Sequence, residues 1–150
     1  MDIQSCISKK FLSKIKPSED LVQKEINEAD YDFERAEKEF EDEDWKWAIV
    51  KAYYSIFHAS RAVLFKCGLR EKKHFAIAVV LEELNKRGKL ESEYVNYFNA
   101  ALSSRENADY HYVYSREIAE HNIEIAERFI LRIKKLLKEL KSKNPMGTTP

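Results

Sequence analysis

Between Ser103 and Ser115 the sequence gathers side chains that could carry out chemistry. The ten residues from 105 to 114 contain Arg105, Asn107, Asp109, Tyr110, His111, Tyr112 and Tyr114. A histidine titrates near neutral pH and can move protons, and a guanidinium can hold a phosphate with two hydrogen bonds. A helical stretch used only for packing would rarely collect so many hydrogen-bonding groups. If the protein has chemistry, we therefore expect it to centre on Arg105 and His111.

Other common catalytic patterns do not occur in the sequence. It contains no glycine-rich phosphate loop, no paired Asp/Glu metal site and no Cys–His nucleophile arrangement, so we expect no metal and no cofactor. Cys6 and Cys67 stand alone and are predicted to be free thiols. The N-terminus does not resemble a secretory signal, and the longest apolar run, Phe75 to Leu81, is too short to cross a bilayer. We expect a cytoplasmic protein without a membrane partner.

The formal net charge is zero, with 26 basic and 26 acidic residues, which argues against a strongly basic nucleic-acid binder. The charges are nevertheless segregated. Residues 19–44 carry 13 acidic and 3 basic side chains, whereas residues 45–73 and 128–143 each carry 7 basic and 1 acidic. Either these are solvated faces of neighbouring helices that attract one another, or the two basic segments form a stripe that meets phosphate or an acidic partner.

The elements that must position the candidate site are helices. The chain has 150 residues, about the size of one domain, and only three glycines and three prolines, which suits long helices. Apolar residues recur every three or four positions, so the predicted fold class is all-α, an antiparallel bundle of four to five helices over residues 18–143. The long helices are expected at about 18–42, 45–66, 74–86, 92–109 and 115–140, with Asp44 and Ser115 as N-caps.

Residues 1–17 are predicted to form a separate short amphipathic helix. Ile3, Ile7, Phe11 and Ile15 repeat every four residues, and Pro17 stops the pattern. Such a helix could lie on a membrane or on a partner, but packing against its own bundle is the preferred interpretation. At the other end of the chain, residues 144–150 are expected to form a disordered tail.

The candidate site is predicted to bend after its first half. Residues 110–114 read YHYVY, a string that is rich in aromatic residues and weak in helix propensity. On one continuous helix, Arg105 and His111 would point about 120° apart and lie about 9 Å apart along the axis. Asp109, in contrast, lies one turn from Arg105 and is its natural ion-pair partner. Arg105 and His111 can meet at one phosphate if the helix breaks near Tyr110, or if a dimer supplies one residue from each chain.

Two stretches of sequence carry a family resemblance. The first is WAIVKAYYSIFHASRAVLFKCGLREKKH (47–74), and the second, some thirty residues later, is RENADYH (105–111). Together they resemble the HEPN family, and the resemblance extends over about residues 20–140. It implies a small antiparallel helical bundle that is usually dimeric. In prokaryotes such domains are often encoded beside a minimal nucleotidyltransferase, so the resemblance also implies that partner.

The resemblance implies a catalytic pair, because the family's motif is an arginine and a histidine with four to six residues between them. Arg105 and His111 have that spacing. In active members the pair supports metal-independent RNA cleavage: the histidine transfers a proton at the ribose 2′-OH or at the leaving oxygen, and the arginine stabilises charge on the phosphate. The implied function is that of an RNA-cleaving toxin or defence effector, restrained by a nucleotidyltransferase antitoxin. Four residues of the same segment are expected to support the pair: Asn107, Asp109, Tyr112 and Tyr114.

Two other functions remain open. The protein could be a non-catalytic adaptor that binds a nucleotide or the partner protein. It could also be a dimeric bundle in which an Arg105–Asp109 pair only ties helices together while His111 is exposed. In the family's toxins the tyrosine that the nucleotidyltransferase modifies lies two residues after the histidine. Here that position is Val113, with a tyrosine on either side.

The remaining histidines and the tryptophans are assigned structural roles. His58 and Arg61, on the tyrosine-rich helix, are expected to serve the fold or a dimer interface. His74 is interpreted as a helix-start residue, and His121 as an isolated histidine on a helix surface. Trp45 and Trp47 begin a helix and are predicted to pack against the bundle or to contact a partner.

Overall fold

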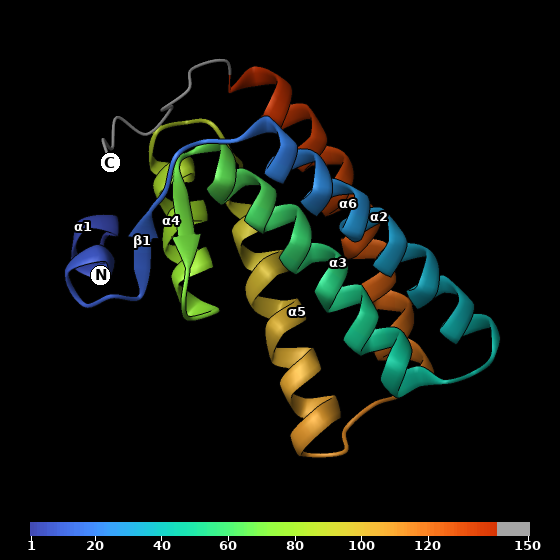
Figure 1. Ribbon diagram of the computed structural model, residues 1–150. Coiled ribbons are helices and arrows are strands. Elements are labelled where there is room, and N and C mark those ends of the chain that lie inside the picture. Colours follow the sequence, from blue (N-terminus) through green and yellow to red (C-terminus); the bar gives the residue numbers. More distant parts are fainter. Residues whose placement is uncertain (141–150) are drawn as a thin grey trace.

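The computed structural model describes residues 1–140, which form a helical bundle with a small appendage beside one end of it (Figure 1). In chain order the elements are α1 (Ile3–Ser8), β1 (Leu12–Lys14), α2 (Glu19–Glu41), α3 (Trp45–Lys66), β2 (Leu69–Glu71), α4 (Phe75–Lys86), α5 (Ser92–Tyr110) and α6 (Arg116–Glu139). The predicted helical bundle is confirmed, and the five long helices lie within a few residues of their expected positions. The predicted tail, residues 144–150, lies outside the described residues.

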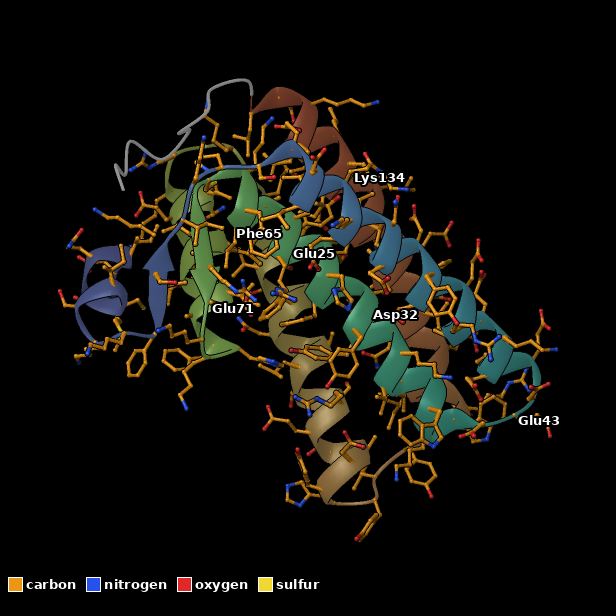
Figure 2. The ribbon with its side chains drawn as sticks, viewed as in Figure 1. Glu25, Asp32, Glu43, Phe65, Glu71 and Lys134 are labelled. Atoms are coloured by element: carbon orange, nitrogen blue, oxygen red, sulfur yellow. The ribbon has the colours of Figure 1, made fainter. Side chains whose placement is uncertain are left out.

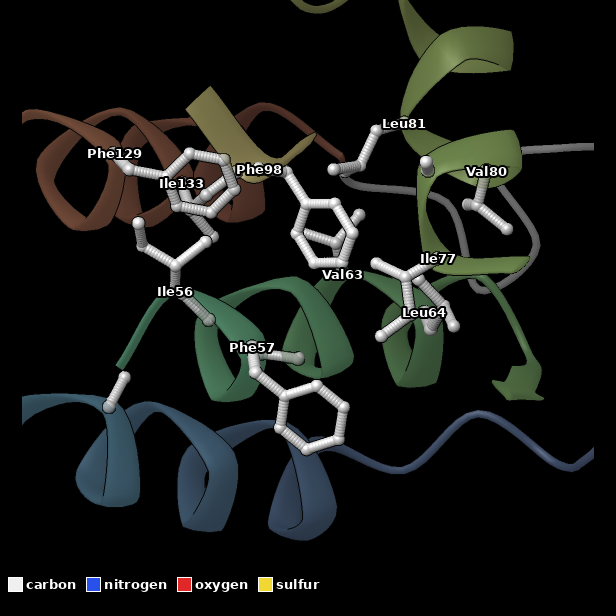
Figure 3. Close-up of a cluster of buried hydrophobic side chains, with 14 of the residues drawn as sticks. Ile56, Phe57, Val63, Leu64, Ile77, Val80, Leu81, Phe98, Phe129 and Ile133 are labelled. Carbon is white, nitrogen blue, oxygen red and sulfur yellow. The ribbon is translucent and has the colours of Figure 1, made fainter. Parts of the chain in front are cut away.

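Helix α3 lies at the centre of the bundle because it is apolar on almost every side. Of its 22 residues, 14 are buried, and it packs against α2, α4, α5 and α6. Helices α2 and α6 are amphipathic and cover it from one side, whereas α5 lies against it from another (Figure 1). Figure 3 shows the resulting core, in which side chains of several helices interdigitate. Its members include Ile56, Val63, Leu81, Phe98, Phe129 and Ile133.

A second, smaller apolar cluster joins the end of α5 to the start of α6. Ala108 of α5 and Ala119 of α6 are buried against Ala48 and Ile49 of α3. At the start of α6, the Ser115 hydroxyl accepts a hydrogen bond from the backbone N–H of Ile118, so the predicted N-cap is confirmed. The small cluster therefore fixes both ends of the connection that contains residues 111–115.

The N-terminal segment differs from the single helix predicted for residues 1–17. Helix α1 ends at Ser8 because Lys10 adopts a left-handed conformation, with φ of 63°. The N–H of Phe11 then donates to the carbonyl of Cys6 at 2.8 Å, which is the hydrogen bond of a Schellman helix end. The chain continues as strand β1. Ile3, Cys6 and Leu12 are buried, so the preferred interpretation, that this segment packs against its own bundle, is confirmed.

Strand β1 pairs with β2 in antiparallel register and holds the connection between α3 and α4. Leu12 lies opposite Glu71, the N–H of Ile15 donates to the carbonyl of Gly68, and the N–H of Lys72 donates to the carbonyl of Phe11, both at 2.9 Å. The ring of Phe11 meets that of Phe75 edge to face, with centroids 5.1 Å apart. The first seventeen residues thus fix the backbone that leads into α4.

The segregated charges lie on neighbouring helices. Acidic α2 forms ion pairs with basic α3 through Glu39 and Lys51, at 2.7 Å, and with basic α6 through Asp30 and Lys134, at 2.9 Å. These contacts support the explanation in which oppositely charged helix faces attract one another. Within residues 1–140, no helix combines the length and hydropathy that a bilayer crossing requires.

Candidate functional site

Arg105 lies on α5, and its side chain is held against α3. Only 12% of the side chain is exposed. Its guanidinium carbon lies 5.1 Å and 5.9 Å from the ring centroids of Tyr53 and Tyr54, and 5.9 Å from that of Tyr110. A cation is attracted to the face of an aromatic ring at such distances. Three tyrosine rings therefore fix the position of the charge.

The helical period explains why an arginine occupies this place. Phe98, Ala101 and Ala108 form the buried face of α5, and Arg105 lies four residues after Ala101 and three before Ala108. It therefore shares the face that packs on α3. The alanines allow the two helices to approach, and the long arginine side chain extends along the tyrosine rings of α3.

The hydrogen-bonding capacity of Arg105 is largely unused within residues 1–140. Its contact with Asp109 is an ion pair at 3.7 Å, through Nη1. Its Nε is buried and has no hydrogen-bond partner. Nη1 and Nη2 make no hydrogen bond within 3.5 Å to another described residue and are not among the buried unpaired atoms, so both donors are open to solvent.

His111 lies where α5 ends. The helix stops at Tyr110, and the N–H groups of His111 and Val113 both donate to the carbonyl of Asn107, at 3.1 and 3.0 Å. Tyr112 adopts a left-handed conformation, with φ of 57°. The predicted bend at residues 110–114 is therefore confirmed. The imidazole of His111 is exposed and has no hydrogen bond or ion pair with any described residue.

The bend exposes the residues that follow Arg105. It does not bring His111 into contact with Arg105. Tyr110, Tyr112, Val113 and Tyr114 are between 44% and 77% exposed. Asn107 is exposed and contributes its backbone carbonyl to the helix end, whereas Asp109 pairs with Arg105. Of the predicted site residues, the fold brings together Arg105 and Asp109, and it presents the others to solvent.

Four further side chains at this site were not identified from the sequence as site residues. They are Tyr53, Tyr54 and Tyr110, which contact Arg105, and His74, whose Nδ1 lies 2.7 Å from the Tyr53 hydroxyl. His74 occupies the N-cap position of α4, which agrees with the prediction that it is a helix-start residue. Its side chain, however, makes no capping hydrogen bond. Instead its ring packs on Phe57, with centroids 4.6 Å apart.

Burial sets the protonation of Tyr53 and His74. Tyr53 is fully buried, and this raises the pKa of its hydroxyl well above the usual range, so the phenol stays protonated. Burial, and next the charge of Arg105, lower the pKa of His74. His74 is therefore neutral at neutral pH, and the pair is a phenol hydrogen-bonded to a neutral imidazole.

His58 and Arg61 lie in a separate polar cluster between α2, α3 and β2. The two nitrogens of His58 lie 2.6 Å from a Glu25 oxygen and 3.5 Å from an Asp32 oxygen. Arg61 contacts Glu25 at 3.4 Å and Glu71 at 3.1 Å. Figure 2 shows the labelled carboxylates of Glu25, Asp32 and Glu71 along the border between these elements. The cluster ties three elements together, which supports a structural role for both residues.

The other residues singled out lie away from Arg105. Trp45 packs edge to face on Phe40, with centroids 5.2 Å apart, whereas Trp47 is 44% exposed. His121 is exposed on α6. In the described part of the chain, no three His, Cys, Asp or Glu side chains lie close enough to hold a metal ion.

The fold and the Arg105 site define a small α-helical bundle with an arginine and a histidine at the end of its penultimate helix. Residues 22–137 match the HEPN domain family, so the chain belongs to that family. The resemblance inferred from residues 47–74 and 105–111 is thereby confirmed. The match begins after α1 and β1, and the N-terminal segment lies outside it.

The chain is similar to three proteins of prokaryotes. Two belong to Methanocaldococcus jannaschii and carry the name "putative toxin". The first is 34% identical over 122 residues, which are 79% of this chain and 90% of that protein. The second is 29% identical over 119 residues, which are 77% and 81% of the two chains. A UPF0332 protein of Thermotoga maritima is 31% identical over 97 residues, 63% of this chain and 74% of that protein.

Proposed function

We propose that this protein is an RNA-cleaving toxin in which Arg105 and His111 act on one phosphodiester. The observation that carries the proposal is the state of these two side chains. Three tyrosine rings fix the guanidinium of Arg105 while Nη2 stays accessible, and His111 is exposed at the helix end without a partner among residues 1–140. The two relatives that carry the name "putative toxin" agree with this function.

The proposed reaction uses the nucleophile of the substrate itself. The ribose 2′-oxygen bonds to phosphorus, the bond from phosphorus to the 5′-oxygen breaks, and a 2′,3′-cyclic phosphate remains. The proton of the 2′-OH leaves to a base, and the 5′-oxygen receives a proton. His111 transfers one of these protons, and Arg105 stabilises the negative charge that grows on the phosphate oxygens.

A dimer is part of the proposal because Arg105 and His111 do not contact each other within one chain. The loop around His111 exposes Tyr110, Tyr112, Val113 and Tyr114, and adjoining apolar groups of this kind favour association. A two-fold contact over this loop would cover those residues. It would also bring His111 of one protomer toward Arg105 of the other.

Cleavage of a labelled RNA in excess EDTA tests the chemistry. We expect cleavage to persist, and the products to end in 2′,3′-cyclic phosphate. His111→Ala should lower the rate by about 10²–10⁴-fold through the lost proton transfer, and Arg105→Ala by a comparable factor. The matched control is His121→Ala, an exposed histidine away from the site, which should cleave like the wild type. Wild-type protein without ribonuclease activity, or cleavage that survives both substitutions, would contradict the proposal.

Mixing two inactive variants tests whether the site is shared between protomers. In a dimer of one Arg105→Ala chain and one His111→Ala chain, one shared site contains two intact residues and the other contains none. Random exchange of protomers should therefore restore about a quarter of the wild-type activity. If each chain carried its own complete site, the mixture would stay inactive.

We further propose that the partner is a nucleotidyltransferase antitoxin, as is common in this family. Tyr112 and Tyr114 are exposed beside His111, so either hydroxyl is accessible for modification. A gene for a small nucleotidyltransferase next to the gene of this protein would support the pairing. So would a nucleotide mass increase on this loop after incubation with that enzyme and ATP.

A non-catalytic adaptor is the second candidate, and the exposed aromatic loop favours it. Tyrosines that are 44% to 77% exposed offer a surface on which a partner protein or a nucleotide base could pack. An adaptor would bind its partner equally well after His111→Ala, whereas Tyr112→Ser should weaken the complex. The ribonuclease assay distinguishes the two candidates.

A further inference from the structure

Three side chains from three helices meet beside the candidate catalytic pair. Tyr53 comes from the middle of α3, His74 from the start of α4 and Arg105 from α5. Tyr53 joins them, because its ring lies under the guanidinium of Arg105 and its hydroxyl lies 2.7 Å from Nδ1 of His74. We propose that His74 is a second phosphate-binding residue of the Arg105 site, and that Tyr53 is the residue that positions it. This inference rests on the proposed ribonuclease function.

The direction of the Tyr53–His74 hydrogen bond follows from chemistry. A buried phenol that stays protonated needs an acceptor for its proton, and Nδ1 of His74 is the one within reach among the described residues. A neutral imidazole that accepts at Nδ1 carries its own proton on Nε2. Tyr53 therefore fixes His74 in the tautomer whose Nε2–H is a donor.

Nε2 of His74 is available to a ligand. It has no hydrogen-bond partner among residues 1–140, and it is not one of the buried unpaired atoms of that region, so solvent reaches it. The same two observations hold for Nη2 of Arg105. Each of the two residues that contact Tyr53 thus has an N–H donor that remains unsatisfied and accessible. Oxygen atoms of an anion match such donors.

The charge of the surroundings favours an anion there. Lys72 and Lys73 immediately precede His74, are exposed and make no ion pair with another described residue. Arg105 adds a third positive charge, which Asp109 offsets in part at 3.7 Å. Glu71 and Glu106 bring negative charge near His74; Glu71 is paired with Arg61, which leaves Glu106 as the opposing charge. A phosphodiester that bridges Arg105 and His74 would be bound by two donors and attracted by the lysines.

Binding without turnover tests the inference. The probes are a 2′-O-methyl RNA hexanucleotide, which lacks the attacking hydroxyl, and inorganic phosphate. In nitrogen-resolved NMR spectra of the histidine side chains, the RNA should shift the Nε2 resonance of His74 and leave that of His121 unchanged. No shift at His74 at saturating RNA would overturn the inference. So would a shift caused by inorganic phosphate and not by the RNA, because the ligand would then be a free anion.

Two substitutions at His74 separate its two nitrogens. His74→Asn keeps a polar atom near the position of Nδ1 but none at Nε2, whereas His74→Gln reaches the position of Nε2. If Nε2 binds phosphate, His74→Asn should weaken RNA binding about tenfold, and His74→Gln should retain most of the affinity. Tyr53→Phe keeps the buried ring and removes the hydroxyl. It should weaken binding by a smaller factor and change the tautomer that NMR detects.

The outcomes distinguish this inference from the proposed function. If the wild type cleaves RNA and His74→Asn binds and cleaves equally well, the inference fails and the function stands. If RNA shifts His74 as expected but no cleavage occurs, the ribonuclease function fails and the phosphate-binding role of His74 stands. Equal melting temperatures of wild type and variants ensure that a loss of binding reports on the site.

Discussion

Arg105 combines a place in the packing of the bundle with a charge that a substrate could use. Its contacts with three tyrosine rings are contacts of a partly buried cation, and each such contact contributes about 0.5–1 kcal/mol or somewhat more. The 3.7 Å pair with Asp109 is long and contributes less, about 0–1 kcal/mol. The tyrosines, and not the aspartate, therefore hold Arg105 in place.

We expect Arg105→Ala to lower the free energy of unfolding by about 1–3 kcal/mol, because the variant loses the ring contacts. Asp109→Ala should cost less than about 1 kcal/mol. Urea denaturation of the two variants and the wild type measures both values. If both variants instead lost more than about 3 kcal/mol of unfolding free energy, and by equal amounts, the Arg105–Asp109 pair would be a structural ion pair. The segment would then serve the fold and not catalysis.

His74 should make stability depend on pH in a definite direction. Its pKa in the folded protein lies below the usual 6.5, because burial and the charge of Arg105 disfavour the imidazolium; Arg61 acts in the same sense, and Glu71 and Glu106 oppose it. As the pH falls through 6.5, the unfolded chain binds the proton first, so the folded protein loses stability. Unfolding measured between pH 7.5 and about pH 5 should show a smaller loss for His74→Gln than for the wild type. Identical pH profiles would contradict this.

At the scale of elements, several helices end on residues that are not glycine. Lys10 and Glu43 both adopt left-handed conformations, with φ of 63° and 60°. Each lies one residue beyond a helix C-cap, Lys10 after α1 and Glu43 after α2. Gly68 and Gly88 occupy such positions with φ of 72°. The two glycines differ in their surroundings. A Cβ on Gly68 would lie 3.1 Å from the carbonyl oxygen of Ile15, whereas a Cβ on Gly88 would have nothing within 4 Å.

Gly68→Ala should therefore destabilise the protein more than Gly88→Ala. Both variants place an alanine in a left-handed conformation, which costs about 1–2 kcal/mol. Only Gly68→Ala also pushes against backbone, at the carbonyl of the β1 segment, and this contact cannot move without disturbing the strand pair. The midpoints of guanidinium denaturation compare the two directly. Equal midpoints would mean that the strand pair yields without cost.

The same elements show how far the sequence predicts the structure. The long helices follow from apolar periods that continue over 12 to 24 residues, and the bend at residues 110–114 follows from a local run of aromatic residues. The sequence does not indicate the end of α1, because the four-residue period of Ile3, Ile7, Phe11 and Ile15 continues through it and no glycine marks the turn at Lys10. Tyr53, His74 and Arg105 come together only through the packing of α3, α4 and α5. No local pattern could reveal that contact.

For the whole molecule, we predict an assembly no smaller than a dimer. The chain has a mass of 17.7 kDa, and light scattering at tens of micromolar should give at least twice that value. Val113→Asp places a charge in the exposed aromatic loop and should shift the mass toward that of the single chain. Tyr31→Ser changes an exposed aromatic residue of α2 and serves as the control. A wild-type mass of a single chain would remove the dimer and, with it, the shared site.

The pairing of β1 with β2 has a consequence for the order in which the protein can assemble during synthesis. Residues 1–17 leave the ribosome before the partner of β1, which lies more than fifty residues later, at Leu69–Glu71. Until β2 and α4 have been made, Ile3, Cys6 and Leu12 have no surface to pack on. Residues 1–17 therefore become fixed only after a segment that is made later. Because they anchor the backbone before His74, the proposed phosphate-binding groups would reach their positions only after α4 and α5 have been made.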